Sequence, residues 1–393
     1  MTYTTRTTCR SCDEANFEAV LDLGDCYLPT FVVARDEALP KAPLDLVRCD
    51  SCGLLQLRHE TDPELLCRDY WYRSGINQTM RDALADVVLD GMRYSKEGVW
   101  LDIGANDGYL LSRVSERFTK IASEPALNMQ PMLEEHADHI DPNFFTADGF
   151  LEYARHADVI TSCACFYHVS EPDIFVHDVA RCLADGGVWI NQLSDAPTML
   201  RLNALDSICH EHACYWDAHQ LNEVYARHGL HIVSIKHNTV NGGSIRVAAM
   251  KAKNAGSSVL HGVAETRSVD VEAFADRVRR WKVLMTDLMD LPAVRSSPLW
   301  GIGASTKGSI AMQYLDMNDR FIALADRNPA KWGLQPAGVW VPILSEDAMR
   351  KAMPRFAVNW IWGFREEIIH RESALRSGGT TIIMPLPNPE FIL

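Results

Sequence analysis

One short stretch constrains the fold more than any other. Residues 99–111 begin as an apolar segment, pass through a glycine turn with Gly104 and Gly108, and continue in a helical pattern from Tyr109. A strand, a glycine turn and a helix in this order open a Rossmann-like fold, and the turn brings backbone close to a ligand at the helix N-terminus. Further short apolar segments end at polar or glycine-containing turns at residues 120–123, 158–163 and 188–191. This alternation predicts an α/β protein with a doubly wound sheet. Apolar positions at helical spacing in residues 271–291, which end before Pro292, predict a long helix that leads into a further unit.

The residues of the turn favour S-adenosylmethionine over a dinucleotide as the ligand. The spacing is Gly-x-Asn-x-Gly, and dinucleotide folds instead use Gly-x-Gly-x-x-Gly. Asp102 lies where a carboxylate could meet the amino group of the cofactor. Glu124 follows about 20 residues later, at a strand end from which carboxylates reach ribose hydroxyls, and a solvated strand end is the alternative. The predicted cofactor-binding residues are Asp102, Gly104, Asn106, Gly108, Glu124 and, on the adenine side, Asp148.

Four cysteines form two Cys-x-x-Cys pairs, Cys9 with Cys12 and Cys49 with Cys52. Two such pairs separated by a long insert can supply four thiolates to one tetrahedral zinc ion, and Gly53 suits the tight turn after the second pair. Zinc with four thiolate ligands has no open coordination position, so its expected role is structural. A redox-active dithiol is the alternative, and the presence of two pairs in turn-rich context argues against it.

Charge and hydropathy narrow the classes of partner. The 393 residues carry a formal net charge of −14, which disfavours binding to nucleic acid or to an anionic membrane surface. No segment approaches the about 18–20 apolar residues that span a bilayer. The polar, threonine-rich start of the chain does not resemble a secretory signal, so a cytoplasmic location is expected.

Residues 206–216 concentrate acid–base groups, with His210, Glu211 and His212 side by side. Imidazoles titrate near neutral pH and suit proton transfer, which Glu211 could support. The histidines stand at i and i+2 and not at the i, i+4 spacing of a helical zinc site, so a catalytic metal is the minor alternative. His168 follows the expected strand at 158–163, at the sheet end where α/β folds bind ligands. A polar loop with buried, hydrogen-bonded histidines is the other alternative.

Two later motifs are candidates for contact with the substrate. In residues 301–308 a glycine turn is followed by Ser305, Thr306 and Lys307, a possible phosphate cradle that lacks the spacing of an ATPase loop. Residues 326–333 are expected on the far lip of the same cleft. Residues 241–246, which end at Arg246, either contribute to the site or form a structural hairpin.

Taken in order, these motifs resemble the sugar C-methyltransferases of deoxysugar biosynthesis, which methylate a ring carbon of a nucleotide-linked keto-deoxysugar. The resemblance covers nearly the whole chain. It rests on the paired cysteines, Asp-Ile-Gly-x-Asn-Asp-Gly, His-Glu-His-x-x-Tyr, Gly-Gly-Ser-x-Arg, Gly-x-Gly-Ala-Ser-x-Lys-Gly and Asp-x-Asn-Pro-x-Lys-x-Gly. It implies a zinc-binding domain in residues 1–70, a methyltransferase domain in 71–270 and a Rossmann-like substrate-binding domain in 271–393.

The resemblance also implies roles for single residues. His212 is expected to be the general base, with His210 and Glu211 in support, and Tyr72 and His168 are expected to line the sugar pocket. The expected substrate-binding residues are Tyr215, Arg246, Ser305, Thr306 and Lys307. Three residues depart from the family pattern, in which tyrosine, histidine and glutamate are usual: Cys209, Asn241 and Gln192. These departures leave the use of S-adenosylmethionine as cofactor unchanged, and they concern which substrate, and which atom of it, accepts the methyl group.

Two further functions are weighed against C-methylation. O- or N-methylation of a related metabolite would need a base for a hydroxyl or amine proton and no ketone. A catalytically silent scaffold would keep the fold without the concentration of His, Glu, Tyr and Lys in these motifs. The motifs therefore favour an enzyme that uses S-adenosylmethionine and a structural zinc ion.

Overall fold

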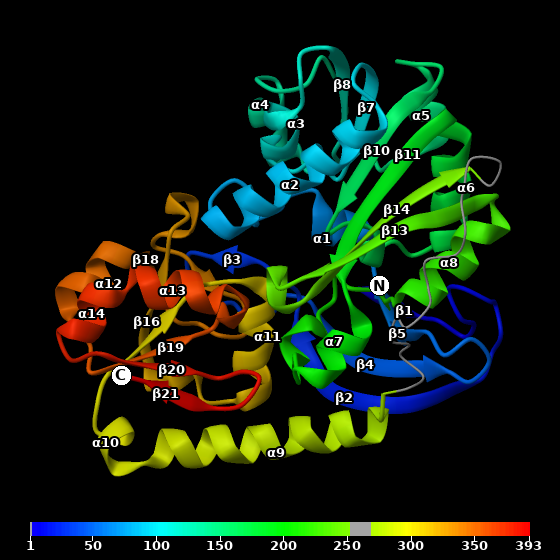
Figure 1. Ribbon diagram of the computed structural model, residues 1–393. Coiled ribbons are helices and arrows are strands. Elements are labelled where there is room, and N and C mark those ends of the chain that lie inside the picture. The colour runs from blue at the N-terminus through cyan, green and yellow to red at the C-terminus, as the bar shows by residue number, and fades with distance from the viewer. Residues whose placement is uncertain (1, 252–268) are drawn as a thin grey trace.

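A computed structural model describes residues 2–251 and 269–393 of the chain (Figure 1). Two Rossmann-like arrangements of sheet and helix are joined to a smaller N-terminal sheet. The predicted α/β class, with a zinc-binding N-terminal module and two Rossmann-like units, is confirmed. Among the described residues, none of the helices combines the length and apolar character required to cross a bilayer.

The central sheet has seven strands in the order β13-β14-β11-β10-β7-β8-β9. The strands β11, β10, β7, β8 and β9 are parallel. At one edge, β14 pairs antiparallel with β11, and β13 pairs antiparallel with β14. The bounds are β7 (Gly98–Ile103), β8 (Phe118–Ser123), β9 (His139–Asp141), β10 (Ala157–Cys163), β11 (Leu183–Ser194), β13 (Leu230–Asn238) and β14 (Ser244–Lys251). The helices and 3₁₀ turns along this part are α2 (Gln78–Tyr94), α3 (Tyr109–Arg113), η1 (Leu127–Met129), α4 (Gln130–Leu133), α5 (Ala147–Leu151), η2 (Phe166–His168), α6 (Pro172–Cys182), α7 (Ala196–Arg201), η3 (Leu205–Ser207), α8 (Ala218–Arg227) and η4 (Val240–Gly242).

Alternate residues of the central strands face opposite sides of this sheet, and helices cover both. Trp100 packs in a core with Leu84 of α2, whereas its neighbour Leu101 packs in a second core with Val176 of α6 and Leu221 of α8. Successive side chains of a strand point to opposite faces, so a strand with helices on both sides is apolar at nearly every position. This explains why β7 is apolar at Val99, Trp100, Leu101 and Ile103, and the exception, Asp102, is bonded to Thr161 of β10.

The N-terminal sheet is antiparallel, with the strand order β12-β5-β4-β2. Its fourth strand, β12, comes from far along the chain and belongs to residues 206–216, here named the histidine strip. The bounds are β2 (Phe17–Tyr27), β4 (Lys41–Cys49), β5 (Leu55–Leu57) and β12 (Cys214–Tyr215). The neighbouring elements are β1 (Tyr3–Thr5), which pairs with β6 (His59–Thr61), β3 (Phe31–Val32), which pairs with β17 (Gln335–Pro336), and the helix α1 (Pro63–Cys67).

The C-terminal unit contains a six-stranded sheet in the order β18-β16-β15-β19-β20-β21, parallel except for β21. The strand order reverses beside β15, which is where doubly wound sheets bind ligands. Its strands are β15 (Leu299–Ile302), β16 (Phe321–Asp326), β18 (Ile343–Ser345), β19 (Phe356–Asn359), β20 (Thr381–Met384) and β21 (Glu390–Ile392). Its helices and 3₁₀ turns are α11 (Thr306–Leu315), η7 (Asn318–Arg320), η8 (Pro329–Lys331), α12 (Glu346–Ala352), η9 (Trp362–Phe364), α13 (Arg365–Arg371) and α14 (Ser373–Ser377).

A long helix, α9 (Val271–Asp290), leads into the C-terminal unit and matches the helix predicted for residues 271–291. It ends before α10 (Pro292–Arg295), whose first residue is a proline. Figure 1 shows α9 beneath the C-terminal unit and the N-terminal sheet, and it contacts β2, α7 and α11. Because α9 contacts elements of several units, it helps to fix their arrangement around the central cavity.

Candidate active site

The four paired cysteines meet in one cluster, and their four Sγ atoms lie within 4.8 Å of one another. The Sγ atoms of Cys9 and Cys52 are 3.6 Å apart, as are those of Cys12 and Cys49. A zinc ion with Zn–S bonds of about 2.3 Å needs tetrahedral S–S edges of about 3.8 Å, so the cluster fits zinc. The side chain of Gln56 also donates to Cys9 Sγ (3.1 Å). With four protein ligands the ion has a structural role.

A cavity of about 640 Å³ lies at the carboxyl ends of β7, β8 and β10. Its walls come from the central sheet, from the segment between α1 and α2, and from the first turn of α11 and the turn η9 in the C-terminal unit. Ligands of open α/β sheets bind beyond the carboxyl ends of the strands, so this cavity is the candidate active site.

The end of the cavity next to β7 and β8 contains Gly104, Asn106 and Glu124. Gly104 has a φ of +73°, and a Cβ there would lie 3.1 Å from Cβ of Cys165. Glu124 accepts hydrogen bonds from the backbone N–H groups of Asn106 (2.7 Å) and Ala126 (2.8 Å), and burial raises its pKa.

The same end of the cavity has room and polar atoms for S-adenosylmethionine. The Ser123 hydroxyl lines it and is buried without a hydrogen-bond partner among the described residues, so it is available to a ligand. Gly104 keeps the wall free of a side chain, and Glu124 supplies a carboxylate beside it. These groups fit the cofactor.

The three other predicted cofactor residues lie outside the cavity lining. Asp102 turns toward β10 and accepts from the hydroxyl of Thr161 (2.7 Å), and burial raises its pKa to about 7. Gly108, with a φ of +75°, is the N-cap of α3, where its role is conformational. Asp148 is exposed and pairs with Arg181 (2.7 Å).

The other end of the cavity contains His168, Glu211 and His212, each with a nitrogen or carboxylate oxygen within 4.8 Å of the others. The rings of His168 and His212 are stacked, with centroids 5.4 Å apart. Burial, with the charge of Lys307 as a smaller cause, lowers the pKa of His168 to about 4 and that of His212 well below its ordinary value. Burial also raises the pKa of Glu211 to about 7. Both imidazoles are therefore neutral at neutral pH.

Two tyrosines from the segment after α1 complete this end. The hydroxyl of Tyr70 donates to Glu211 (3.4 Å). The hydroxyl of Tyr72 is buried and, within the described part of the chain, has no hydrogen-bond partner. A buried donor without a partner in the protein is available to a polar atom of the substrate.

The C-terminal unit adds Ser305, Thr306 and Lys307, which the sequence predicted, to the cavity wall. Ser305 is the N-cap of α11 and accepts from the backbone N–H of Gly308 (2.9 Å). The ammonium group of Lys307 donates to the hydroxyl of Ser207 (3.0 Å). A cation and a helix N-terminus thus face the end of the cavity away from the turn that contains Gly104 and Gly108, here named the cofactor turn.

Three expected site residues lie behind the wall. His210 points its Nε2 at the carbonyl of Ala42 (3.0 Å), Tyr215 donates to the carbonyl of Ser207 (3.3 Å), and both lie outside the lining. Arg246 of β14 also lies outside the lining and pairs with Asp90 (2.6 Å) and Asp86 of α2. For residues that are adjacent in the sequence, such as His210 and Glu211, the sequence alone does not show which side chain faces the cavity.

The structure also brings in residues to which sequence reasoning gave no role. Asp206 lines the cavity, and Trp362 donates to its Oδ2 (2.8 Å). Burial raises the pKa of Asp206, and its Oδ1 has no partner among the described residues. Asp206 begins the histidine strip, which was a usable signal. Trp362 comes from a turn after β19 and had no motif to mark it.

The three departures from the family pattern lie at different depths. Asn241 lines the cavity with a φ of +54°. Cys209 is buried behind the wall. Gln192 accepts from Arg246 (2.9 Å) and from Asn238 (3.1 Å), outside the lining. Asn241 is therefore the departure with direct access to a substrate.

Known families match the chain in three consecutive parts. Residues 9–66 match a zinc binding domain, residues 72–235 a methyltransferase domain, and residues 239–387 a C-methyltransferase C-terminal domain. The C-methyltransferase NovU of Streptomyces niveus is 27% identical over 405 residues, which cover 98% of this chain and 96% of that protein.

Solved structures align with about half of the chain. An S-adenosylmethionine-dependent methyltransferase from Clostridium acetobutylicum aligns over 45% of this chain and 92% of its own, with 12% identity and a TM-score of 0.36. The N-methyltransferase NodS from Bradyrhizobium japonicum aligns over 44% and 97%, with 11% identity and a TM-score of 0.36.

Proposed function

The chain belongs to the C-methyltransferase family with an N-terminal zinc-binding domain, and we propose that it methylates a ring carbon next to the ketone of a nucleotide-linked keto-deoxysugar. The enzyme is a methyltransferase that uses S-adenosylmethionine. The keto-sugar acceptor is proposed from the resemblance of the motifs and from the chemistry of the cavity.

One observation carries the proposal: the cofactor turn and two neutral, buried imidazoles line the same cavity. A sugar carbon becomes a nucleophile only after a proton next to a ketone is removed, so carbon methylation needs a base beside the acceptor. A histidine that is neutral at working pH can accept that proton. Burial keeps His168 and His212 neutral but also weakens them as bases. Proton uptake therefore needs a group that stabilises the imidazolium, and the Glu211 carboxylate lies within 4.8 Å of both.

We assign the base to His212, which is buried in contact with the ring of Tyr167 at a centroid distance of 4.4 Å. Bound S-adenosylmethionine supplies an electrophilic methyl group. His212 takes the proton from the acceptor carbon, and a donor stabilises the enolate oxygen. The unpartnered hydroxyl of Tyr72 suits this second task better than His210, whose Nε2 faces Ala42. Glu211 and His168 orient the imidazole and the sugar.

The nucleotide part is assigned to the C-terminal unit. Ser305, Thr306 and Lys307 stand at the N-terminus of the ten-residue helix α11 and line the cavity. A helix N-terminus and a lysine favour phosphate oxygens. Residues 1–70, 71–270 and 271–393 are then the zinc-binding, methyltransferase and substrate-binding domains, with substrate between the last two.

Deuterium exchange tests the base directly. In D₂O, with the cofactor product S-adenosylhomocysteine bound, the protein should exchange the acceptor-carbon hydrogen of a nucleotide-linked 4-keto-deoxysugar without methylating it. His212→Ala should slow this exchange about a hundredfold or more and still bind S-adenosylmethionine. His231→Ala, which changes a histidine of β13 outside the cavity lining, is the matched control. Exchange at the wild-type rate in His212→Ala would remove His212 from the role of base.

A further inference from the structure

The segment from Tyr70 to Thr79, here named the strap, joins α1 to α2 and is bonded to the cofactor turn. The Asn106 side-chain oxygen accepts from the backbone N–H (2.9 Å) and the hydroxyl (3.1 Å) of Ser74. Asn106 itself lies in the turn between β7 and α3 and lines the cavity. The strap therefore fastens to a side chain at the cofactor end of the site.

The strap also carries Tyr72 into the cavity. The Asn106 side-chain N–H group donates to the backbone carbonyl of Tyr72 (3.0 Å), so the same residue bonds to the strap backbone at Tyr72 and at Ser74. At the residue after Ser74, the backbone N–H of Gly75 donates to the carboxylate of Asp107 (2.8 Å). Any movement of the strap would shift Tyr72 and disturb the cofactor turn together.

The C-terminal unit holds the other end of the strap through Glu367 of α13. One carboxylate oxygen of Glu367 accepts from the backbone N–H (3.1 Å) and the hydroxyl (2.7 Å) of Thr79. Thr79 lies in the first turn of α2, where the N-cap residue Asn77 makes no side-chain capping bond. A carboxylate here satisfies a free N–H group and interacts favourably with the positive end of the helix dipole. Glu367 thus caps α2 from another unit.

A second contact from the same unit reinforces this arrangement. The side chain of Asn328, in the turn after β16, donates to the backbone carbonyl of Trp71 (3.4 Å). The strap is therefore held near both of its ends by the C-terminal unit and in its middle by the cofactor turn.

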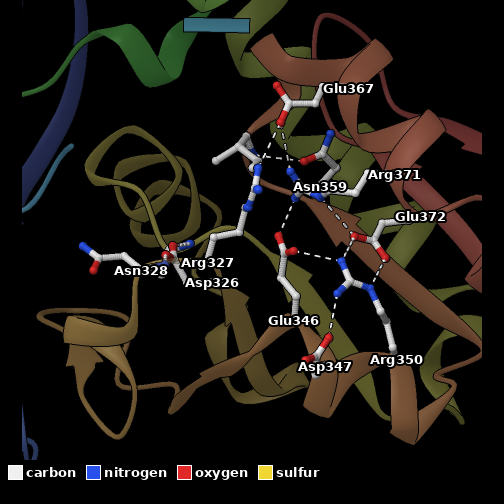
Figure 2. Close-up of polar contacts among 12 residues, drawn as sticks. Asp326, Arg327, Asn328, Glu346, Asp347, Arg350, Asn359, Glu367, Arg371 and Glu372 are labelled. Carbon is white, nitrogen blue, oxygen red and sulfur yellow. Dashed lines mark hydrogen bonds and ion pairs between the residues drawn. The ribbon is translucent and has the colours of Figure 1, made fainter. Parts of the chain in front are cut away.

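Figure 2 shows why the Glu367 carboxylate is fixed in this place. Its other oxygen is 3.2 Å from both Arg327 and Arg371, and Arg371 is also paired with Glu346 and Glu372. Burial opposes ionisation of Glu367, but the bonds from Thr79 and the charges of the two arginines hold its pKa below the ordinary value. One oxygen faces the arginines and the other remains for α2.

We propose that Glu367 is a positioning residue for cofactor binding: by capping α2 it holds the strap on Asn106, and this raises the affinity for the cofactor. The effect on affinity does not depend on the identity of the acceptor. Only the consequence for Tyr72 as an enolate donor rests on the function proposed above.

The test compares Glu367→Ala, Glu367→Gln and the control Glu366→Gln in the full-length, zinc-loaded protein. Glu366 is the neighbouring acid, with a side chain that is 89% exposed. Calorimetry gives the Kd for S-adenosylhomocysteine, and hydrogen exchange with mass spectrometry follows residues 70–79. We expect Glu367→Ala to weaken binding on the order of tenfold and to speed exchange in the strap. Glu367→Gln keeps an oxygen that accepts from Thr79 and should lie between Glu367→Ala and wild type, while the control should match wild type.

Thr79→Val supplies a second variant that removes only the hydroxyl. It should weaken binding less than Glu367→Ala does, and it should add little in the Glu367→Ala background because the two residues form one contact. An unchanged Kd and unchanged strap exchange in Glu367→Ala would overturn the proposal. So would faster exchange spread evenly over the whole chain, which marks a merely structural ion pair. None of these readouts uses a sugar, so a wrong acceptor assignment would leave them unchanged.

Discussion

At the scale of single residues, burial decides what the acid–base groups can do. The sequence predicted that His168, Glu211 and His212 would act together, and the structure places their polar atoms within 4.8 Å of one another. The neutrality of both imidazoles comes from desolvation. Desolvation depends on residues that are distant in the sequence, so the residues next to a histidine do not predict it. The contact of His210 with the carbonyl of Ala42 is distant in the sequence too and could not be predicted.

The lowered pKa of His168 makes a prediction about pH and stability. The folded protein holds this imidazole neutral down to about pH 4, whereas in the unfolded chain it takes up a proton near its ordinary value of 6.5. The unfolded state therefore binds more protons in this window, and the contribution of His168 to stability is lost as pH falls from 6.5 to 4. Between pH 4 and 6.5, His168→Asn should reduce the slope of the free energy of unfolding against pH by up to about 1.4 kcal/mol per pH unit.

Urea unfolding of wild type and His168→Asn at several pH values between 5 and 7 measures this difference. His156→Asn, a change in the turn before β10, serves as the control because its side chain is exposed. Parallel slopes for wild type and His168→Asn would contradict the account of a buried neutral imidazole.

At the scale of elements, the regular strands and the longest helix could be predicted from periodicity, and the short elements could not. The prediction of strands at 99–103 and 158–163 and of a helix at 271–291 corresponds to β7, β10 and α9. The two-residue strand β12 pairs with β5 from more than 150 residues away. A pairing this short has no periodicity of its own, so only the three-dimensional arrangement reveals it.

Close packing between α2 and β7 gives a second prediction. A Cβ on Gly91 would lie 2.4 Å from the indole of Trp100. Gly91→Ala gains about 1 kcal/mol in helix propensity but loses about 1–3 kcal/mol through overpacking, so it should not stabilise the protein. Thermal unfolding should show an equal or lower midpoint, whereas Leu89→Ala, at a position that is 61% exposed on the same helix, should have little effect. A higher midpoint for Gly91→Ala would show that the indole moves aside freely.

The zinc cluster gives another prediction at the scale of elements. Cys49 ends β4, and the same sheet includes β12, which belongs to the histidine strip. Cys52→Ser should lower the zinc content below one equivalent, lower the thermal midpoint and reduce methyl transfer by loosening the strip. Cys182→Ser, a buried cysteine of α6 outside the cluster, is the control for loss of a thiol. Full activity with no bound zinc would separate the cluster from the active site.

At the scale of the whole molecule, the cavity exists because separate parts of the chain converge on it. The cofactor turn, the strap, the histidine strip and the first turn of α11 all contribute to the lining of one cavity. The order of motifs along the sequence indicated which family the chain resembles. It did not show that Trp362 from the C-terminal unit would bond to Asp206, because that contact joins positions 156 residues apart.

The most direct test of the central claim is product analysis. The purified protein is incubated with S-adenosylmethionine and a panel of nucleotide-linked 4-keto-deoxysugars, and the products are examined by mass spectrometry and NMR. We expect one product to gain the mass of a single methyl group, with NMR placing that group on a ring carbon next to the ketone. Bound cofactor without methylation of any keto sugar, or a methyl group on oxygen or nitrogen, would contradict the proposed reaction and turn attention to the acceptor side at Asn241.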